Sequence, residues 1–303
     1  MLVVFGSINL DLTYHVKKLP KDGETVIANG YTIGPGGKGA NQALAAARMG
    51  VKTALVAKTG DDANSVRVLN NLKRNEVMTS GVAKSETLPT GTATIIVDEK
   101  GNNQIIYVPG ANNEISAEQL PSDILHNKNV LLAQMETPLE ETVVALKKAK
   151  DSGARTILNL APAQKIPSIV MQLAHYFIVN EVEADYLIKT LKLDPGKNIT
   201  DKARALSQIG KTTVIITLAE KGCVAVTPED NIIAIEPPKI DKVVDSTGAG
   251  DCFAGTFAAC LHEGMDLKSA IKTAITAATL SCLKPGAQNS YPYKDDIREL
   301  MKK

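Results

Sequence analysis

Seven consecutive residues, Asp245 to Asp251, combine small side chains with a terminal carboxylate and read Asp-Ser-Thr-Gly-Ala-Gly-Asp. The apolar stretch at 252–261 predicts a buried helix directly after them. Glycines in this place let backbone N–H groups converge at the helix N-terminus, where they favour an anion such as a phosphoryl group in transfer. Asp251 could then be the general base that accepts the proton of an attacking hydroxyl. In isolation, an aspartate after a glycine-rich turn is more often a helix cap, so this interpretation depends on other features.

A second glycine-rich run, Gly34 to Gly39, fits the G-x-G-x-x-G dinucleotide fingerprint and opens a predicted helix at 40–49. Asp61 and Asp62 follow at about the distance that such a fingerprint requires. Alone, this run suggests a nicotinamide-dependent oxidoreductase. It is weak evidence, because the strand before it is predicted to be antiparallel, and the first parallel strand lies elsewhere. No P-loop sequence of the form G-x-x-x-x-G-K-[ST] is present.

Polar residues after the first predicted strand have the spacing of a sugar site. Asn9 and Asp11 are two apart, so in an extended chain they face one side. A carboxylate that accepts from two neighbouring hydroxyls, with an amide beside it, suits a vicinal diol, although Asn and Asp are also common in turns. Gly37, Lys38 and Asn41 would add close backbone approach, a cation and an amide. Lys38 could instead be an ordinary surface lysine.

The elements that must position these residues alternate between short β-branched runs and helical patterns. This alternation predicts a mainly parallel sheet that is covered on both faces. Ligands of such sheets lie beyond the carboxyl ends of the strands, where Asn159, Asn180, Thr217 and Glu136 occur. Glu136 is equally consistent with a cleft acid and with a solvated loop acid. The predicted strands are 3–5, 53–57, 130–134, 156–159, 176–179 and 214–217, and the predicted helices are 40–49, 142–150, 182–191 and 201–209.

Two segments depart from this alternation of strand and helix patterns. Residues 24–33 and 90–108 read as antiparallel strands, and the second segment turns at 98–102. No helix follows to cover them, so we expect a small separate sheet that serves as a lid or a dimer surface. The chain has no low-complexity linker and no internal repeat, which favours one main domain with insertions.

The composition excludes several classes of protein. The 303 residues are 44% hydrophobic and 22% charged, with a net charge of +1, which gives no electrostatic reason to expect nucleic acid or a membrane surface. Aromatic residues make up only 4%, so the core must be aliphatic. The four cysteines form no C-x-x-C pair and the four histidines show no metal-ligand spacing. No signal peptide or membrane span is recognisable, so we expect a cytoplasmic protein.

Taken together, these runs resemble the ribokinase-like (PfkB) carbohydrate kinase family over essentially the whole chain. The segment 36–42, Gly-Gly-Lys-Gly-Ala-Asn-Gln, is similar to the N-terminal signature of that family, and Asp245 to Asp251 is similar to its more specific C-terminal signature. Asn9-x-Asp11, Asn180-x-x-Glu183 and the run from Thr217 to Gly222 match its other landmarks. The resemblance implies a three-layer α/β/α fold with a mainly parallel central sheet, formed as a single domain over 1–303. Insertions at about 12–35 and 88–110 would form an antiparallel β lid that closes over the sugar and pairs two subunits in a homodimer.

The resemblance also implies a role for each matching residue. Asp251 would deprotonate the primary hydroxyl of the sugar, and the anion hole would be formed by the N–H groups of Gly248, Ala249 and Gly250. The sugar would be held by Asn9, Asp11, Gly37, Lys38, Asn41, Glu136 and Asp251. ATP would be contacted by Asn180, Glu183, Thr217, Leu218, Ala219, Glu220, Lys221, Gly222 and Gly250, with Glu183 organising Mg²⁺. A monovalent cation, K⁺, would be bound by loops that contain Asp245, Thr247, Ser281, Lys284, Gly286 and Ser290.

The activity that this resemblance implies is phosphorylation of D-ribose at O5 by ATP, which gives D-ribose 5-phosphate. Another family substrate, such as fructose, a nucleoside or a sugar phosphate, is the nearest alternative. A nicotinamide-dependent oxidoreductase that uses the run Gly34 to Gly39 is more remote. A non-catalytic sugar-sensing module is disfavoured, because Asp251 is present where a kinase needs its base.

Overall fold

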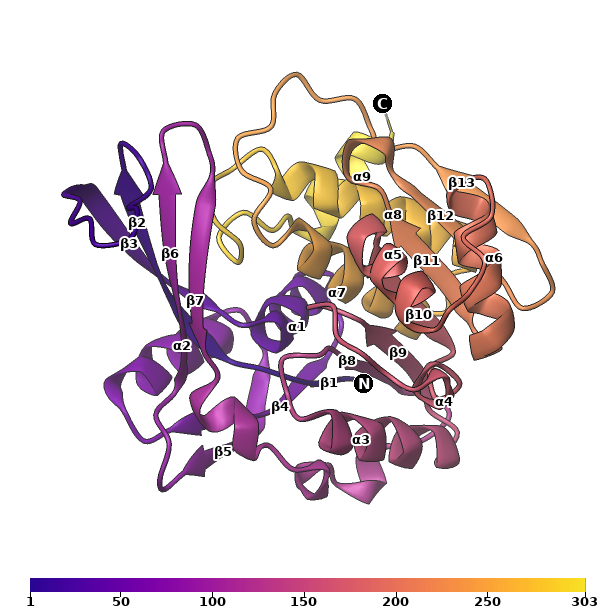
Figure 1. Ribbon diagram of the computed structural model, residues 1–303. Helices are drawn as coiled ribbons and strands as arrows, with labels where there is room; N and C mark the ends of the chain where they lie inside the picture. Colours follow the sequence, from indigo (N-terminus) through magenta and orange to yellow (C-terminus); the bar gives the residue numbers. More distant parts are fainter. Residues whose placement is uncertain (303) are drawn as a thin grey trace.

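The computed structural model describes residues 1–302 and contains a large and a small β-sheet (Figure 1). The nine strands of the large sheet lie in the order β13-β12-β11-β10-β9-β8-β1-β4-β5, and only β12 and β13 run antiparallel to their neighbours. All six strands predicted from the sequence are confirmed. The strands are β1 (Leu2–Phe5), β4 (Thr53–Gly60), β5 (Met78–Ser85), β8 (Val130–Ala133), β9 (Arg155–Asn159), β10 (Tyr176–Asn180), β11 (Thr213–Thr217), β12 (Cys223–Val226) and β13 (Ile232–Ile235).

Helices cover both faces of this sheet and form a three-layer α/β/α arrangement, as expected. One apolar core lies under α1 (Lys38–Arg48), α2 (Ala63–Arg74), α7 (Ala249–His262), α8 (Leu267–Ser281) and α9 (Lys294–Met301). The other core lies under α3 (Leu139–Asp151), α4 (Ser168–Met171), α5 (Glu181–Thr190) and α6 (Ile199–Gly210). Short 3₁₀ helices are η1 (Gly110–Glu114), η2 (Ala117–Gln119), η3 (Ser122–Ile124) and η4 (Ala219–Lys221). Among the residues described, no helix has both the length and the apolar character needed to cross a membrane.

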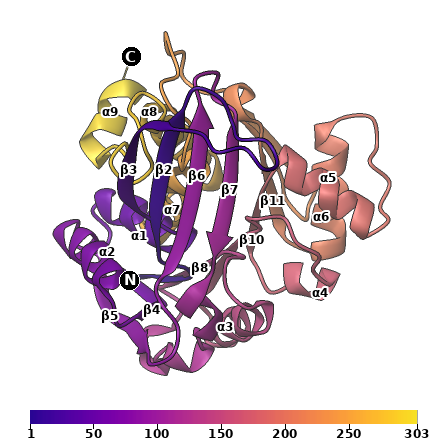
Figure 2. The same cartoon turned by 60° about the vertical axis from the view of Figure 1, so that its left-hand side comes forward.

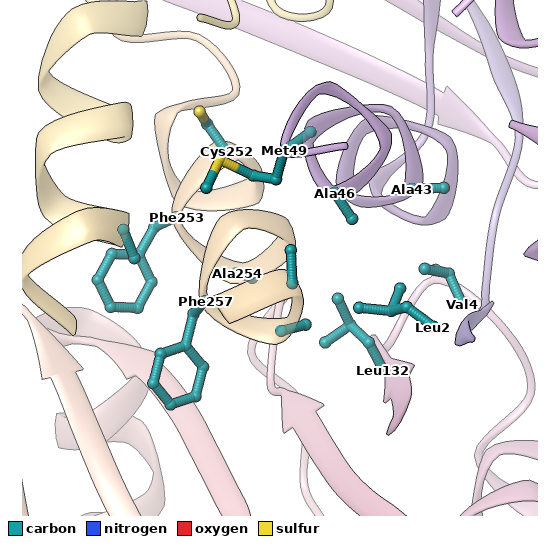
Figure 3. Close-up of a cluster of buried hydrophobic side chains, with 14 of the residues drawn as sticks. Leu2, Val4, Ala43, Ala46, Met49, Leu132, Cys252, Phe253, Ala254 and Phe257 are labelled. Carbon is teal, nitrogen blue, oxygen red and sulfur yellow. The ribbon is translucent and has the colours of Figure 1, made fainter. Parts of the chain in front are cut away.

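Helix α7 is the buried centre of the first core. Its side chains from Asp251 to Leu261 are all buried, and they pack against α1 and against Leu2, Val4 and Leu132 of the sheet (Figure 3). The approach to α1 is close, because a Cβ atom added to Gly255 would lie 2.3 Å from the backbone oxygen of Gln42. This contact holds the first turns of α1 and α7 side by side.

The small sheet stands away from the large sheet (Figure 1), and its strands lie side by side in the order β3-β2-β6-β7 (Figure 2). Its strands are β2 (Asn9–Val16), β3 (Ala28–Gly36), β6 (Gly91–Asp98) and β7 (Asn103–Val108). The sheet begins at Asn9, earlier than the predicted insertion. It is also mixed and not purely antiparallel, because β2 pairs with β6 in parallel. Both of these strands leave the main domain in the same direction, whereas β3 and β7 return to it.

The order of the large sheet places a topological switch beside β1. From β1 the chain first builds outwards through β4 and β5, and then returns to β8 and builds in the opposite direction through β9, β10 and β11. A crevice opens beyond the carboxyl ends of strands at such a point. The segments that follow β1 and β8 therefore face one common site, beneath the small sheet.

Candidate active site

Asp251 lies in the first turn of α7 and is 6% exposed. Its Oδ2 atom accepts a hydrogen bond from Asn41 Nδ2 at 2.9 Å, and its Oδ1 atom accepts one from Gln42 Nε2 at 2.8 Å. The N-cap of the helix is Gly248, with no side-chain cap hydrogen bond. The interpretation of Asp251 as a helix cap is therefore wrong, because its carboxylate is held by α1 and not by the start of its own helix.

A second layer of amides holds the first. A carboxylate can only accept, so Asn41 and Gln42 must turn their NH₂ groups towards Asp251 and their carbonyl oxygens away from it. Gln134 Nε2 donates to Gln42 Oε1 at 2.7 Å, and Gln288 Nε2 donates to Asn41 Oδ1 at 2.9 Å. Each oxygen of Asp251 thus ends a polarised chain of two amides. Sequence reasoning missed these three glutamines, because type and spacing do not distinguish a buried glutamine from a surface one.

The backbone before α7 is shaped for close approach by another group. Gly248 has a φ of 76°, in the left-handed region that favours glycine. Tyr291 Oη donates to the Gly248 carbonyl oxygen at 2.9 Å and fixes this turn, while the Ala249 N–H donates to the Ser246 carbonyl oxygen at 3.1 Å. A Cβ atom added to Gly250 would meet no heavy atom within 4 Å, so space remains there at the helix N-terminus. Of the three predicted anion-hole donors, the N–H of Ala249 is thus already engaged within its turn.

Asn9 and Asp11 lie on the same face of β2, as their spacing predicts. Asn112 Nδ2 donates to Asn9 Oδ1 at 2.8 Å, which leaves the Asn9 NH₂ group as the available donor. The Oδ1 atom of Asp11 is buried and has no hydrogen-bond partner within the described chain. A Cβ atom on Gly36 would lie 2.0 Å from Asp11 Oδ2, so glycine is required there. A donor and a buried acceptor without a partner are what two neighbouring ligand hydroxyls would satisfy.

Lys38 lies among four carboxylates and is not a surface lysine, which corrects the alternative kept open above. The attraction of Asp251 raises the pKa of Lys38 most, burial opposes this, and Glu136, Glu183 and Asp11 raise it further. The pKa of Asp11 is raised to about 7 by burial, and then by repulsion from Glu136 and Asp251. The cleft therefore holds four carboxyl groups and one ammonium group, so acidic side chains are in excess, and the Lys38 ammonium group stays protonated.

Glu136 is a cleft residue and not a solvated loop acid. Its Oε2 atom accepts from Ser7 Oγ at 2.6 Å and from the Lys38 backbone N–H at 3.0 Å. These two bonds join the segments after β8 and β1 to the N-terminus of α1, at the topological switch. Ser7 was not predicted from the sequence, because a serine in a strand-end turn carries no specific signal.

Of the residues predicted to contact ATP, Asn180 and Thr217 lie at the carboxyl ends of β10 and β11, and Glu183 lies in the first turn of α5. Asn180 and Glu183 form a capping box at α5, with Glu183 N–H donating to Asn180 Oδ1 at 2.8 Å and Asn180 N–H donating to Glu183 Oε2 at 2.7 Å. Burial raises the pKa of Glu183, although the Asn180 N–H and Lys38 oppose this shift. A cavity of about 150 Å³ joins these residues to the α7 turn, and its lining includes Lys38, Asn159, Asn180, Glu183, Thr217, Gly248, Gly250 and Asp251.

The remaining predicted nucleotide residues form the turn between β11 and β12. The Leu218 N–H donates to the Gly222 carbonyl oxygen at 2.7 Å, which closes the turn around η4. Ala219 and Gly222 have φ angles of 50° and 87°. The structure therefore brings the backbone of Leu218, Ala219, Glu220, Lys221 and Gly222 together as one tight loop directly after Thr217.

The segments predicted to hold a monovalent cation are tied together by Asp245. Its carboxylate accepts from the Thr247 N–H at 2.9 Å and from the Gly286 N–H at 2.8 Å. Burial raises the pKa of Asp245, but these donors more than offset burial, and its pKa is lowered overall. The Ser281 and Ser290 hydroxyls donate to backbone oxygens of their own segments, and Lys284 lies between them in the chain. Within residues 1–302, no cluster of three or more His, Cys, Asp or Glu side chains could hold a metal ion.

Comparison with known proteins identifies the family. A profile described as pfkB family carbohydrate kinase matches residues 1–294, nearly the whole chain. The chain belongs to this family of carbohydrate kinases. Among pfkB relatives, it is 36% identical to a ribokinase from Mus musculus over 304 residues, which cover 98% of this chain and 93% of the relative.

Solved structures agree with the family assignment. A ribokinase from Thermotoga maritima has a TM-score of 0.92 and 34% identity, covering 100% of this chain and 99% of its own. A structure of Arabidopsis thaliana ribokinase complexed with ribose and ATP has a TM-score of 0.90 and 29% identity, covering 100% and 98%. The run Gly34 to Gly39 is therefore the end of β3 and the start of α1 in a kinase, and not a dinucleotide fingerprint.

Proposed function

We propose that this pfkB kinase transfers the γ-phosphoryl group of ATP to O5 of D-ribose, which gives D-ribose 5-phosphate and ADP. The observation that carries the proposal is the buried Asp251 carboxylate. It is clamped by two amides and faces one cavity together with Lys38 and the turn at the start of α7. The ribokinase names of the relatives, and the ribose and ATP in the Arabidopsis complex, support the choice of substrates.

The sugar-side residues suit an uncharged polyol. Asp11 offers a buried acceptor and Asn9 offers a donor, so two adjacent hydroxyls could each find a partner. Asn41, Lys38 and the Gly37 backbone would complete the site. A sugar phosphate fits less well. The one cation in the cleft, Lys38, already faces four carboxylates, so a further phosphate on the sugar would be repelled.

In the proposed reaction, Asp251 accepts the O5 proton while O5 attacks the γ-phosphorus atom. The new O5–P bond forms as the bond between phosphorus and the β–γ bridging oxygen breaks, so ADP leaves with that electron pair. The N–H groups of Gly248 and Gly250 would stabilise charge on the transferring phosphoryl oxygens. Their preorganisation depends on the Gly248 turn, which Tyr291 holds. The proton on Asp251 then passes to solvent after product release.

The acidity of the cleft implies that a divalent cation accompanies ATP. Asp11, Glu136, Glu183 and Asp251 would repel the polyphosphate, and Lys38 alone balances only one of them. Glu183 fits the role of organising Mg²⁺, because it is buried at the cavity and uses only Oε2 in its capping box. Magnesium needs only one or two protein carboxylates when phosphates supply other ligands. When bound, it would neutralise charge on the β- and γ-phosphates.

The loops joined by Asp245 are the proposed site of K⁺. Both run beside the turn that starts α7, and the Gly286 N–H bond to Asp245 already couples them. The proposed ligands are oxygen atoms of residues 245 and 247 and of the segment that contains residues 281, 284, 286 and 290. A cation there would hold the Gly248 turn in its anion-binding form.

The β lid carries exposed apolar side chains on both faces. Ile105 and Tyr107 lie on the face shared with Asp11, whereas Tyr31 and Ile106 lie on the opposite face and are 61% and 62% exposed. The first face would cover the sugar and exclude water during transfer. The second face would pack against the lid of a second copy of the chain, because exposed apolar side chains of this size mark interaction surfaces.

A substrate panel tests the proposal. ATP consumption would be measured with D-ribose, 2-deoxyribose, fructose, fructose 1-phosphate and adenosine, each with and without K⁺. We expect the highest kcat/KM for ribose and a higher rate with K⁺. If another sugar led, the ribose assignment would fail and the kinase assignment would stand. If no sugar were phosphorylated, the proposed function as a whole would be refuted.

A further inference from the structure

Gln288 is a buried amide outside the cleft cavity. It lies in the loop between α8 and α9, is 2% exposed, and does not line the cleft cavity. Its Nε2 atom donates to Asn41 Oδ1 at 2.9 Å, and its Oε1 atom accepts from Asn71 Nδ2 at 2.6 Å. Both of its polar atoms are therefore satisfied by side chains from other elements, α1 and α2.

The direction of this chain of amides is fixed at the Asp251 end. Asp251 can only accept, so Asn41 presents its NH₂ group to Asp251 and its carbonyl oxygen to Gln288. The Asn71 NH₂ group occupies Gln288 Oε1, so Gln288 presents its own NH₂ group to Asn41. An amide in this position has two orientations of nearly equal shape. Only one of them places a donor on Asp251, and Gln288 stabilises that orientation by donating to Asn41 Oδ1.

We propose that Gln288 is a positioning residue for the base Asp251, and that it acts by setting the orientation of the Asn41 amide. This inference rests on the proposed role of Asp251 as general base. Gln288 also belongs to the loop that Asp245 holds through the Gly286 N–H. An ordered loop would therefore stabilise the position of Asp251 through the side chains of Gln288 and Asn41.

The sharpest test is Gln288→Glu, which keeps the size of the side chain and the acceptor for Asn71. It replaces the donor to Asn41 with an acceptor and adds a negative charge. A carboxylate facing Asn41 Oδ1 would turn the Asn41 amide over and bring its oxygen against Asp251 Oδ2. We expect kcat to fall about 10- to 100-fold, since misplacing a catalytic group by about 1 Å has effects of this size.

Gln288→Met is the second variant, because methionine fills similar space without donor or acceptor. It leaves the Asn41 amide free to keep its NH₂ group on Asp251. We expect a smaller loss, of about 3- to 10-fold in kcat. Gln208→Glu is the matched control, because it makes the same chemical change at an exposed position of α6. It should leave kcat within twofold.

A double-mutant cycle separates positioning from a general structural role. In an Asn41→Ala background, Gln288 has no amide to orient, so Gln288→Glu should lower kcat by less than twofold further. A residue that acts on the fold at large would show the same loss in both backgrounds. If Gln288→Glu prevented folding, Gln288→Met in the two backgrounds would decide the question in the same way.

The outcomes distinguish this inference from the proposed function. If wild type and Gln208→Glu phosphorylate ribose while Gln288→Glu and Gln288→Met stay within twofold, the inference about Gln288 is overturned and the function stands. An equal loss for Glu and Met, repeated in the Asn41→Ala background, would also overturn it. If wild type converts a different sugar, the ribose assignment fails and the cycle is run with that sugar. Absence of any sugar phosphorylation would refute both.

Discussion

Replacing Asp11 with asparagine should stabilise the ligand-free protein. Burial and repulsion from Glu136 and Asp251 raise the pKa of Asp11 to about 7 in the folded protein, compared with the ordinary aspartate value of 3.8. Because the folded-state pKa lies above the unfolded one, this group favours folding most below pH 3.8, and stability is lost as the pH rises to about 7. Asparagine has similar shape and no charge, so it removes this cost.

The size of the effect follows from the shift. About three pKa units at roughly 1.4 kcal/mol each give about 4 kcal/mol at pH 8. The attraction of Lys38 lowers the pKa of Asp11 and is already included in this shift, so the expected net gain is about 4 kcal/mol. At pH 5 the wild-type carboxyl is mostly protonated in the folded state, so the gain should shrink to about 1–2 kcal/mol. A gain in the free energy of unfolding that increases with pH would show that the buried Asp11 carboxylate destabilises the ligand-free protein, as expected for a residue whose role is binding.

Urea unfolding of wild type and Asp11→Asn at pH 5, 6, 7 and 8 would measure this gain. Asp61→Asn is the control, since the Asp61 side chain is 73% exposed and should change the free energy of unfolding by less than about 0.5 kcal/mol. Ribose should raise the midpoint of wild type and have little effect on Asp11→Asn. A destabilised Asp11→Asn protein, or a gain that did not change between pH 5 and pH 8, would refute the reasoning.

Three further changes test other parts of the structure. Gly39→Ala would put a Cβ atom 2.5 Å from the Ser7 backbone nitrogen. The free energy of unfolding in urea should therefore fall by about 2 kcal/mol, and the KM for ribose should rise. Unchanged values would contradict this close packing. Glu183→Gln should keep the α5 capping box, so its free energy of unfolding should stay within about 1 kcal/mol of wild type. Its kcat/KM for ATP at fixed Mg²⁺ should fall about 100-fold, and an unaltered kcat/KM would exclude a role for Glu183 in organising magnesium. Ile106→Lys should convert a dimer to monomers in sedimentation velocity. Ile169→Lys is the control and should leave the dimer intact, because it changes an apolar residue that is 59% exposed on α4. A monomeric wild type would refute pairing through the lid.

Much of the fold was predictable, because periodicity reports the surroundings of a strand. Runs such as 3–5 and 130–133 are apolar throughout, and this indicated a sheet covered on both faces. The parallel pairing of β2 with β6 was not predictable, since the two strands are distant in sequence and no local pattern specifies a partner. The early start of β2 at Asn9 was missed for a related reason, because a turn and an extended strand end have the same residue types.

The site was predictable where charge and glycine combine, and not where neutral amides act. Asp251 lies beside a glycine turn that already suggested phosphate chemistry. Lys38 was ambiguous, because its surroundings of four acids arise only when the segments that carry them meet in the fold. Gln42, Gln134 and Gln288 gave no signal, since a glutamine becomes specific only through its partners in space.

The most direct test of the central claim is rapid-quench measurement of ribose 5-phosphate formation by Asp251→Asn, together with calorimetric measurement of ribose binding. Asparagine keeps the size of the side chain but cannot accept the O5 proton. We predict that kcat falls about 10³-fold, the range that general-base catalysis supplies, while the Kd for ribose changes only a few-fold. Turnover at the wild-type rate would contradict the assignment of Asp251 as the base.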